Sequence, residues 1–171
     1  DQNFPVRVLP AFRPDKAMAV ESPEPFNDWV NQLEGAADTK IIDYETYMQA
    51  LRQRHDFFHK TGCRLSDHGV ERPFAEDYTD AQIRRIFEKA RFGKMLEESE
   101  IRQFKSAMLI ALAGIDSEKS WTQQFHLGAL RNVNTPAMQQ LGPDTGYDTI
   151  GDFEIARPLA RFLDRQSQNL R

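Results

Sequence analysis

Three polar clusters contain the side-chain types that bind anions or transfer protons. In the first, Arg13 lies between Phe12 and the pair Pro14 and Asp15. An arginine held at the end of a strand can bind a carboxylate or a phosphate through two parallel N–H donors. The alternative is an Arg13–Asp15 surface pair that shapes a turn, and spacing alone favours this alternative.

The second cluster is the run Ser66, Asp67, His68 and Gly69. A carboxylate next to an imidazole can supply a general acid and base, or bind a metal ion. Neighbouring residues on a strand point to opposite faces, so only one of Asp67 and His68 is expected to enter a site. The alternative is a turn that begins at the aspartate and ends at Gly69.

The third cluster begins at His126, which lies between Phe125 and Leu127 in an apolar run. A lone histidine in such a run is typical of a hydrogen-bonded core residue. The polar residues 131–135 that follow favour a site instead, because active sites of parallel α/β folds collect where the strands end.

Other motifs give weaker signals. His55 and His59 have metal-ligand spacing, but the glutamate of the zinc-protease motif is absent, so structural roles are expected. The run 142–146 is glycine-rich but lacks the Gly-Lys-Ser/Thr ending of a phosphate loop, and we expect a structured loop there. Cys63 is the single cysteine, which excludes an internal disulfide.

The elements that must position these clusters are of two kinds. Short β-prone segments are predicted over 6–12, 62–66 and 121–130. Long helical segments separate them, which is the pattern of parallel strands joined by crossovers. The sequence therefore predicts an α/β, helix-rich fold with about three parallel strands and large helical insertions.

Five helices follow from apolar periodicity and from end signals. They are expected over Trp29–Leu33, ending at Gly35; Tyr44–Phe58, with Asp43 as N-cap; Ile83–Ala90, between a capping box at Thr79 and a stop at Gly93; Ile101–Leu112, ending at Gly114; and from Ile155 or Pro158 to Phe162. The helical insertions thus fall around 24–60 and 79–113 of a single unit over residues 1–171.

Composition narrows the class of partner. The 171 residues include 22 Lys and Arg against 26 Asp and Glu, so the net charge of −4 disfavours a nucleic-acid partner. The longest apolar run, 107–113, is far shorter than the roughly 20 residues that span a bilayer, so no membrane partner is expected. The single cysteine and the absence of a basic-then-apolar leader predict a cytoplasmic location.

Ordered blocks of the sequence resemble the uronate isomerase (glucuronate isomerase) family of the amidohydrolase superfamily. The blocks are Phe12–Asp15, Ser66–Gly69, Phe125–Thr135, Leu141–Gly146 and Ile150–Asp152. The resemblance covers essentially the whole chain, but members of this family are far longer. The chain therefore resembles an internal fragment of such an enzyme, in agreement with a sequence that starts at Asp1 rather than Met.

The resemblance implies a partial (β/α)8 barrel and the interconversion of D-glucuronate with D-fructuronate, and of D-galacturonate with D-tagaturonate, in hexuronate catabolism. It implies that Arg13 holds the substrate carboxylate and that Asp67 and His126 are catalytic. Arg131 and Asn134 fall in a matching segment and are expected to bind substrate. Val133 stands where many members have asparagine, so no role is transferred to it.

The resemblance also implies a divalent metal, with zinc as the expected ion, held by a His-x-His motif and a late aspartate. The chain contains no His-x-His, since its histidines are at 55, 59, 68 and 126. We therefore expect no metal ligands among these residues, main ligands outside the chain, no bound cofactor and no activity of the isolated chain. Its partner is expected to be a hexuronate, and homo-oligomers could form through exposed strand edges.

Two alternatives without catalysis stay open. The first is an acidic-sugar-binding module that grips its ligand through Arg13 and Arg131. The second is a helical assembly module in which the segments 44–58 and 101–112 pack against other chains.

Overall fold

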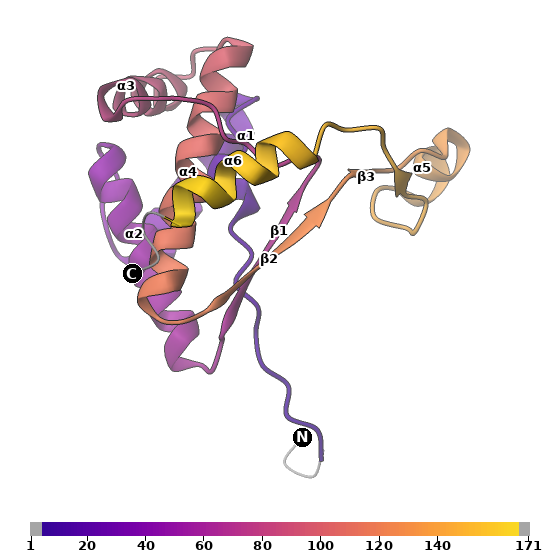
Figure 1. Cartoon of the computed structure of the whole chain (residues 1–171), viewed down its shortest axis with the longest axis horizontal. Helices are drawn as coiled ribbons and strands as arrows, with labels where there is room; N and C mark the ends of the chain where they lie inside the picture. The colour runs from indigo at the N-terminus through magenta and orange to yellow at the C-terminus, as the bar shows by residue number, and fades with distance from the viewer. Residues whose placement is uncertain (1–4, 168–171) are drawn as a thin grey trace.

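The computed structural model describes residues 5–167. The elements, in chain order, are η1 (Asp15–Met18), α1 (Pro23–Ala37), α2 (Tyr44–Lys60), β1 (Leu65–Val70), α3 (Asp80–Arg91), α4 (Glu98–Glu118), β2 (Thr122–Leu127), β3 (Ala129–Leu130), α5 (Thr135–Leu141), β4 (Thr149–Ile150) and α6 (Ala156–Ser167). Helices α1–α4 lie to one side of the pair β1–β2, α6 crosses α4, and the α5 region projects away from them (Figure 1). Within 5–167, no helix is long and apolar enough to cross a membrane.

Strands β1 and β2 form a parallel pair, as the helical segments between them predict. Leu65 lies opposite Thr122 and Val70 lies opposite Leu127. The connection between them contains α3 and α4, which is the crossover that a parallel pair needs. Phe12 adds one parallel bridge on the other edge of β1, where its N–H donates to the Leu65 carbonyl at 3.2 Å. The fold is therefore α/β and rich in helix, as predicted.

The predicted strand over 6–12 is wrong except at Phe12. Val6, Val8 and Leu9 are exposed, and Pro10 has no N–H to donate to a neighbouring strand. Because β1 begins at Leu65, next to the partner of Phe12, the preceding residues have no strand to pair with. Figure 1 shows this N-terminal segment running away from the sheet.

The other two predicted strands are displaced or divided at glycines. Gly62, with φ of 99°, follows α2, so β1 begins only at Leu65 and runs on to Val70. The Asp67–Gly69 run therefore lies within a strand, and the turn alternative is wrong. Gly128, with φ of 79°, ends the pairing of β2 with β1, and β3 then pairs antiparallel with β4.

Five predicted helices are present, with differences at their ends. Thr46 N–H donates to the Asp43 side chain at 2.8 Å, which confirms the predicted N-cap of α2. Gly35 and Gly114 lie inside α1 and α4 rather than ending them. Helix α4 continues to Glu118 because Ile115 and Asp116 in its last turn are buried. The short helix α5 was not predicted.

Two groups of buried side chains hold the helices to one another and to the sheet. Between the helices, aromatic rings from α1–α4 pack edge to face, as Phe26 does with Phe87 and Phe104 at centroid separations near 6.2 Å. Beneath the sheet, a second group fills the space against α2 and α4: Phe12, Cys63, Leu112, Ile115 and Trp121. One face of β1–β2 is thus covered, and the side chains of the other face are free to form a site.

Candidate functional site

Strand alternation divides the polar residues of the sheet between the covered and the open face. The side chain of His68 is fully buried, whereas Asp67 next to it lies on the opposite face. This confirms that only one of the two enters the open face. The open face holds Arg13, Asp67, Gln124 and His126, and the covered face holds Phe12, Ser66, His68, Gln123 and Phe125.

Asp67 is the centre of the open face. Its Oδ1 lies 2.9 Å from His126 Nδ1 and accepts a hydrogen bond from Gln124 Nε2 at 3.1 Å. Its Oδ2 lies 3.8 Å from Arg13 Nη1. The Asp67 carboxylate is 13% exposed and the His126 side chain is 50% exposed, so His126 is not the core histidine that its apolar neighbours alone would indicate. The structure therefore brings Arg13, Asp67 and His126 together.

Arg13 is oriented by Asp15 at the carboxyl end of β1. Arg13 Nε donates to Asp15 Oδ2 at 3.1 Å, and the same oxygen accepts the Gly69 N–H at 3.0 Å. The Asp15 carboxylate raises the pKa of the Arg13 guanidinium through this hydrogen bond and through charge attraction, to which Asp67 adds. The Arg13–Asp15 pair considered as the alternative does exist, but the guanidinium also reaches Asp67 and stays about half exposed.

A buried polar chain lies behind the sheet, between β1 and the helices α2 and α4. Ser66 Oγ donates to Asp116 Oδ2 at 2.5 Å, and Asp116 Oδ1 lies 3.0 Å from His55 Nε2. Ser66 Oγ is also 3.1 Å from His68 Nε2. His55 is therefore structural, as predicted, and His59 separately accepts a hydrogen bond from Trp121 Nε1 at 2.9 Å. Burial lowers the pKa of His68, against the opposing effect of nearby carboxylates.

Arg131 and Asn134 lie after β3, in contacts of their own. Arg131 Nη1 donates to Asp148 Oδ2 at 2.5 Å, and the pKa of Asp148 is lowered by the hydrogen bond from the Asn132 N–H and by Arg131. Asn134 Oδ1 accepts the Ala137 N–H at 3.0 Å and so caps α5. No contact to Arg13, Asp67 or His126 is found for these two side chains among the described residues. The run 142–146 is the structured loop expected from its sequence, tied to Asn132 through the Asp144 N–H.

The residues of the open face do not fit a metal centre. Within residues 5–167, no three His, Cys, Asp or Glu side chains are grouped so that they could share an ion. Asp67 and His126 are directed at each other, and Arg13 adds a positive charge beside them. A structural zinc site takes four protein ligands and a catalytic one three. The arrangement is instead suited to binding an anion next to an acid–base pair.

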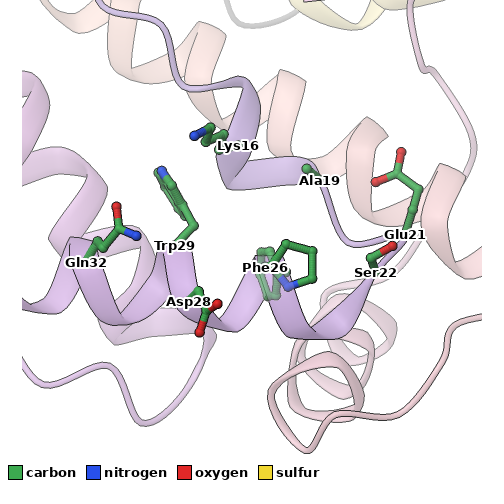
Figure 2. A pocket seen from close by; sticks show the side chains of 9 residues that line it. Lys16, Ala19, Glu21, Ser22, Phe26, Asp28, Trp29 and Gln32 are labelled. Carbon is green, nitrogen blue, oxygen red and sulfur yellow. The ribbon is translucent and has the colours of Figure 1, made fainter. Parts of the chain in front are cut away.

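A hollow of about 480 Å³ lies between η1 and α1, away from this cluster. In Figure 2 the Trp29 ring rises from α1 toward Lys16, and Gln32 lies beside it. Arg13, Asp67 and His126 are absent from its lining residues. The hollow therefore does not belong to the candidate site.

Three residues of the site were not singled out by sequence reasoning. The sequence pattern presents Asp15 only as the turn partner of Arg13 and Gly69 only as the end of a turn, and it attaches no separate prediction to Gln124. The signal for Gln124 was present, because it stands two residues before His126 and so faces the same way on a strand. Gly69 carries a steric signal that only the structure reveals, since an added Cβ would lie 2.5 Å from Arg13 Nη2.

These features define an α/β protein in which a guanidinium, a carboxylate and an imidazole meet on the open face of a parallel pair of strands. The sequence model of the glucuronate isomerase family matches residues 1–170, and the chain belongs to this family. It is 51% identical over 169 residues to a uronate isomerase of Bacteroides thetaiotaomicron, covering 99% of this chain and 36% of that protein. It is 52% identical over 165 residues to a uronate isomerase of Phocaeicola vulgatus, covering 96% of this chain and 35% of that protein. The chain thus spans about a third of the length of these relatives.

Solved structures agree with this assignment. The uronate isomerase of Thermotoga maritima superposes with a TM-score of 0.86 at 31% identity, covering 95% of this chain and 36% of that one. The glucuronate isomerase of Caulobacter crescentus superposes with a TM-score of 0.80 at 24% identity, over 93% and 33% of the two chains. The second likeness concerns the fold alone.

Proposed function

We propose that this chain provides the carboxylate-binding side and an acid–base pair of a uronate isomerase that interconverts D-glucuronate with D-fructuronate, and D-galacturonate with D-tagaturonate. The observation that carries this proposal is the position of Asp67, which lies between the Arg13 guanidinium and the His126 imidazole. A hexuronate has a carboxylate at one end and an aldehyde at the other, so it needs both an anion-binding group and a proton-transfer group.

Arg13 is the proposed partner of the substrate carboxylate. Its guanidinium is half exposed, is held on one edge by Asp15, and leaves N–H donors directed away from that aspartate. A planar guanidinium can offer two parallel N–H groups to the two oxygens of a carboxylate. This match distinguishes a hexuronate from an uncharged hexose, which has no carboxylate to offer.

Asp67 and His126 are the proposed acid–base pair. Isomerisation removes the proton from C2 of the aldose and returns a proton to C1, while the hydroxyl proton on O2 is lost and O1 gains one. With Nδ1–H donating to Asp67, His126 leaves Nε2 free to accept or donate a proton at the half-exposed side of its ring. The Asp67 carboxylate fixes this tautomer and stabilises the imidazolium once the proton has arrived.

Arg131 and Asn134 are proposed to contact the substrate from the segment after β3. For Arg131, the half-exposed guanidinium supports this role. For Asn134, the side-chain oxygen caps α5, which leaves the amide nitrogen for a ligand. Both belong to one sequence block that resembles the family. They would act from the rim of the site, since neither contacts the Asp67 cluster in the described part of the chain.

The rest of the site is proposed to come from residues outside these 171. The divalent metal implied by the family, with zinc as the expected ion, would then have its main ligands there, and the strands described here would form part of a (β/α)8 barrel. Association through the strand edges and a cytoplasmic location belong to the same proposal. The isolated chain is accordingly expected to be inactive.

A chimera tests the proposal. The aligned part of the Bacteroides thetaiotaomicron uronate isomerase is replaced by this chain, which matches it over 169 residues. The chimera is expected to isomerise glucuronate and galacturonate, while the isolated chain with added Zn²⁺ or Mn²⁺ does not. A folded chimera without turnover would contradict the proposal, and turnover by the isolated chain would refute the expected placement of the metal ligands. Metal-free hexuronate binding by the isolated chain, together with a folded chimera that has no turnover, would favour the binding-module alternative.

A further inference from the structure

We propose that His68, buried on the covered face, is a positioning residue that orients the Asp15 carboxylate and through it the Arg13 guanidinium. This inference rests on the proposed function only for its catalytic consequence. Its structural part concerns the contacts of His68, Asp15 and Arg13 themselves. Residues on the covered face would thus determine how an open-face residue meets its ligand.

The two atoms that carry the inference are Asp15 Oδ1 and His68 Nδ1. They lie 3.7 Å apart, and both are buried without a hydrogen-bond partner among the described residues. The other carboxylate oxygen, Oδ2, is already occupied by Arg13 Nε and the Gly69 N–H. A buried carboxylate oxygen without a donor is costly, so a small approach of the imidazole satisfies both atoms at once.

Two further contacts of His68, to Gln123 and to Ser66, bear on which of its nitrogens carries the proton. Gln123 Nε2 lies 3.2 Å from His68 Nε2 and is an amide donor, so Nε2 accepts from it. The Ser66 hydroxyl gives its proton to Asp116, 2.5 Å away, so the Ser66 oxygen is left as an acceptor 3.1 Å from Nε2, and this contact taken alone favours a proton on Nε2. The opposite tautomer, however, would turn the Nδ1 lone pair toward the negatively charged Asp15 carboxylate and leave the Gln123 N–H without this acceptor, so these two contacts together favour the Nδ1–H tautomer.

The imidazole of His68 is held in place from behind. The Phe125 ring stacks on it with a centroid separation of 5.4 Å. Ser66 lies 3.1 Å from Nε2 and is itself fixed by Asp116, which His55 holds from the other side. Because Ser66, Asp116 and His55 are buried and Phe125 is partly buried, the ring has one packed position from which to direct its Nδ1–H at Asp15. A purely structural histidine would need no such relation to Arg13.

The first test reads the tautomer in the unmodified chain. Long-range ¹⁵N–¹H spectra of the imidazole at pH 8 are expected to show the His68 proton on Nδ1. A proton on Nε2 would overturn the inference, because that tautomer cannot donate to Asp15. This measurement needs neither substrate nor metal, so its result is independent of the proposed function.

The second test follows hydrogen exchange of the Arg13 Nε–H. His68→Asn keeps an amide donor near the position of Nδ1, whereas His68→Gln places its amide nitrogen near Nε2 and His68→Leu has none. Exchange is expected to be about tenfold faster in the Gln and Leu variants, the factor for losing about one hydrogen bond, and within about twofold of the original in the Asn variant. Equal exchange in all folded variants would overturn the inference.

An internal control exists in each sample. Arg84 Nε donates to Glu45 in an exposed ion pair, and neither of these two side chains contacts His68 among the described residues. Its exchange is expected to be the same in all four proteins, which separates a local effect at Arg13 from general loosening. Should His68→Leu not fold, the comparison of His68→Asn with His68→Gln still decides the question.

The third test addresses catalysis in the chimera. His68→Gln is expected to raise KM for hexuronates about tenfold with kcat changed less than about twofold, and His68→Asn to restore KM. An unchanged KM in an active His68→Gln chimera would contradict the catalytic part of the inference. If the unsubstituted chimera is itself inactive, the proposed function fails, while the tautomer and the exchange rates still decide the positioning role.

Discussion

Asp67 Oδ1 and His126 Nδ1 lie 2.9 Å apart across the two parallel strands. The strand register explains this contact, because Asp67 pairs with Gln124 and His126 follows two residues later on the same face. The contact leaves Nε2 as the free nitrogen of His126. Arg13 reaches the other oxygen of the same carboxylate, so one aspartate joins the two functional side chains.

Replacement of His126 by asparagine removes the proposed proton carrier and keeps a donor for Asp67. In the chimera, His126→Asn is expected to lower kcat by about 100-fold or more, the usual contribution of a positioned acid–base group, with little change in KM. Steady-state kinetics with glucuronate measure this. His59→Asn is the matched control, because His59 contacts Trp121 instead of the site, and it should keep its turnover. Turnover of His126→Asn at the level of the unsubstituted chimera would remove His126 from the mechanism.

A methyl group at position 69 tests the placement of Arg13 by steric means. The Cβ of Gly69→Ala would lie 2.5 Å from Arg13 Nη2, and the flexible guanidinium can move away with little strain. We expect a several-fold rise in KM for hexuronates and a small change in Tm. Gly35→Ala is the control, since nothing lies within 4 Å of its Cβ on α1, and it should stabilise the helix by about 0.5–1 kcal/mol. An unchanged KM for Gly69→Ala would mean that the guanidinium position is unimportant for binding.

The free energy of unfolding is expected to depend on pH through His68. Burial lowers the pKa of His68 below its ordinary value of 6.5, so the unfolded chain binds the proton more readily than the folded chain. The stability that the folded state gains from keeping His68 neutral is therefore fully present above pH 6.5. It is lost as the pH falls from there toward the lowered pKa of the folded state. Denaturant unfolding at pH 7.5 and 5.5 measures it, and His68→Asn should lose less stability between the two values. Equal losses in both proteins would contradict the assignment to His68.

Asp116 is expected to contribute to stability rather than to chemistry. It is buried and bonded to both His55 and Ser66, so Asp116→Ala leaves polar groups without partners and should cost about 3–5 kcal/mol of unfolding free energy. Glu118 lies two residues after Asp116 and forms an exposed ion pair with Arg52. Glu118→Ala, which removes this pair, should lower the free energy of unfolding by about 1 kcal/mol or less. Urea titration compares the two variants. Similar small losses in both would show that the buried chain is unimportant for stability.

The features that could be predicted from the sequence are those with local signals. Asp43 and Thr79 stand at the starts of α2 and α3, and the helices between the strands required a parallel pair. The prediction of a strand over residues 6–12 was wrong because strand pairing depends on a partner far along the chain, and that partner strand begins only at Leu65. The predicted helix end at Gly114 was wrong because burial of the next two residues outweighs the helix-breaking tendency of one glycine.

In the candidate site, too, local signals could be predicted from the sequence and contacts between distant residues could not. Arg13, Asp67 and His126 could be named from residue type and family resemblance, and alternation correctly separated Asp67 from His68. The connection of Asp15 with His68 could not be predicted, because it joins residues 53 positions apart through a single buried contact. The burial of Ser66 beside Asp116 depends likewise on how α4 packs under the sheet.

The measurement that tests the central claim most directly is KM for glucuronate in the Arg13→Met chimera. Methionine keeps much of the length of the side chain and loses every donor to the substrate carboxylate. We predict that KM rises by about 10–100-fold and that the preference over uncharged hexoses is lost, as expected when hydrogen bonds to a charged group are removed. An unchanged KM in an active Arg13→Met chimera would contradict the claim that this arginine binds the hexuronate carboxylate.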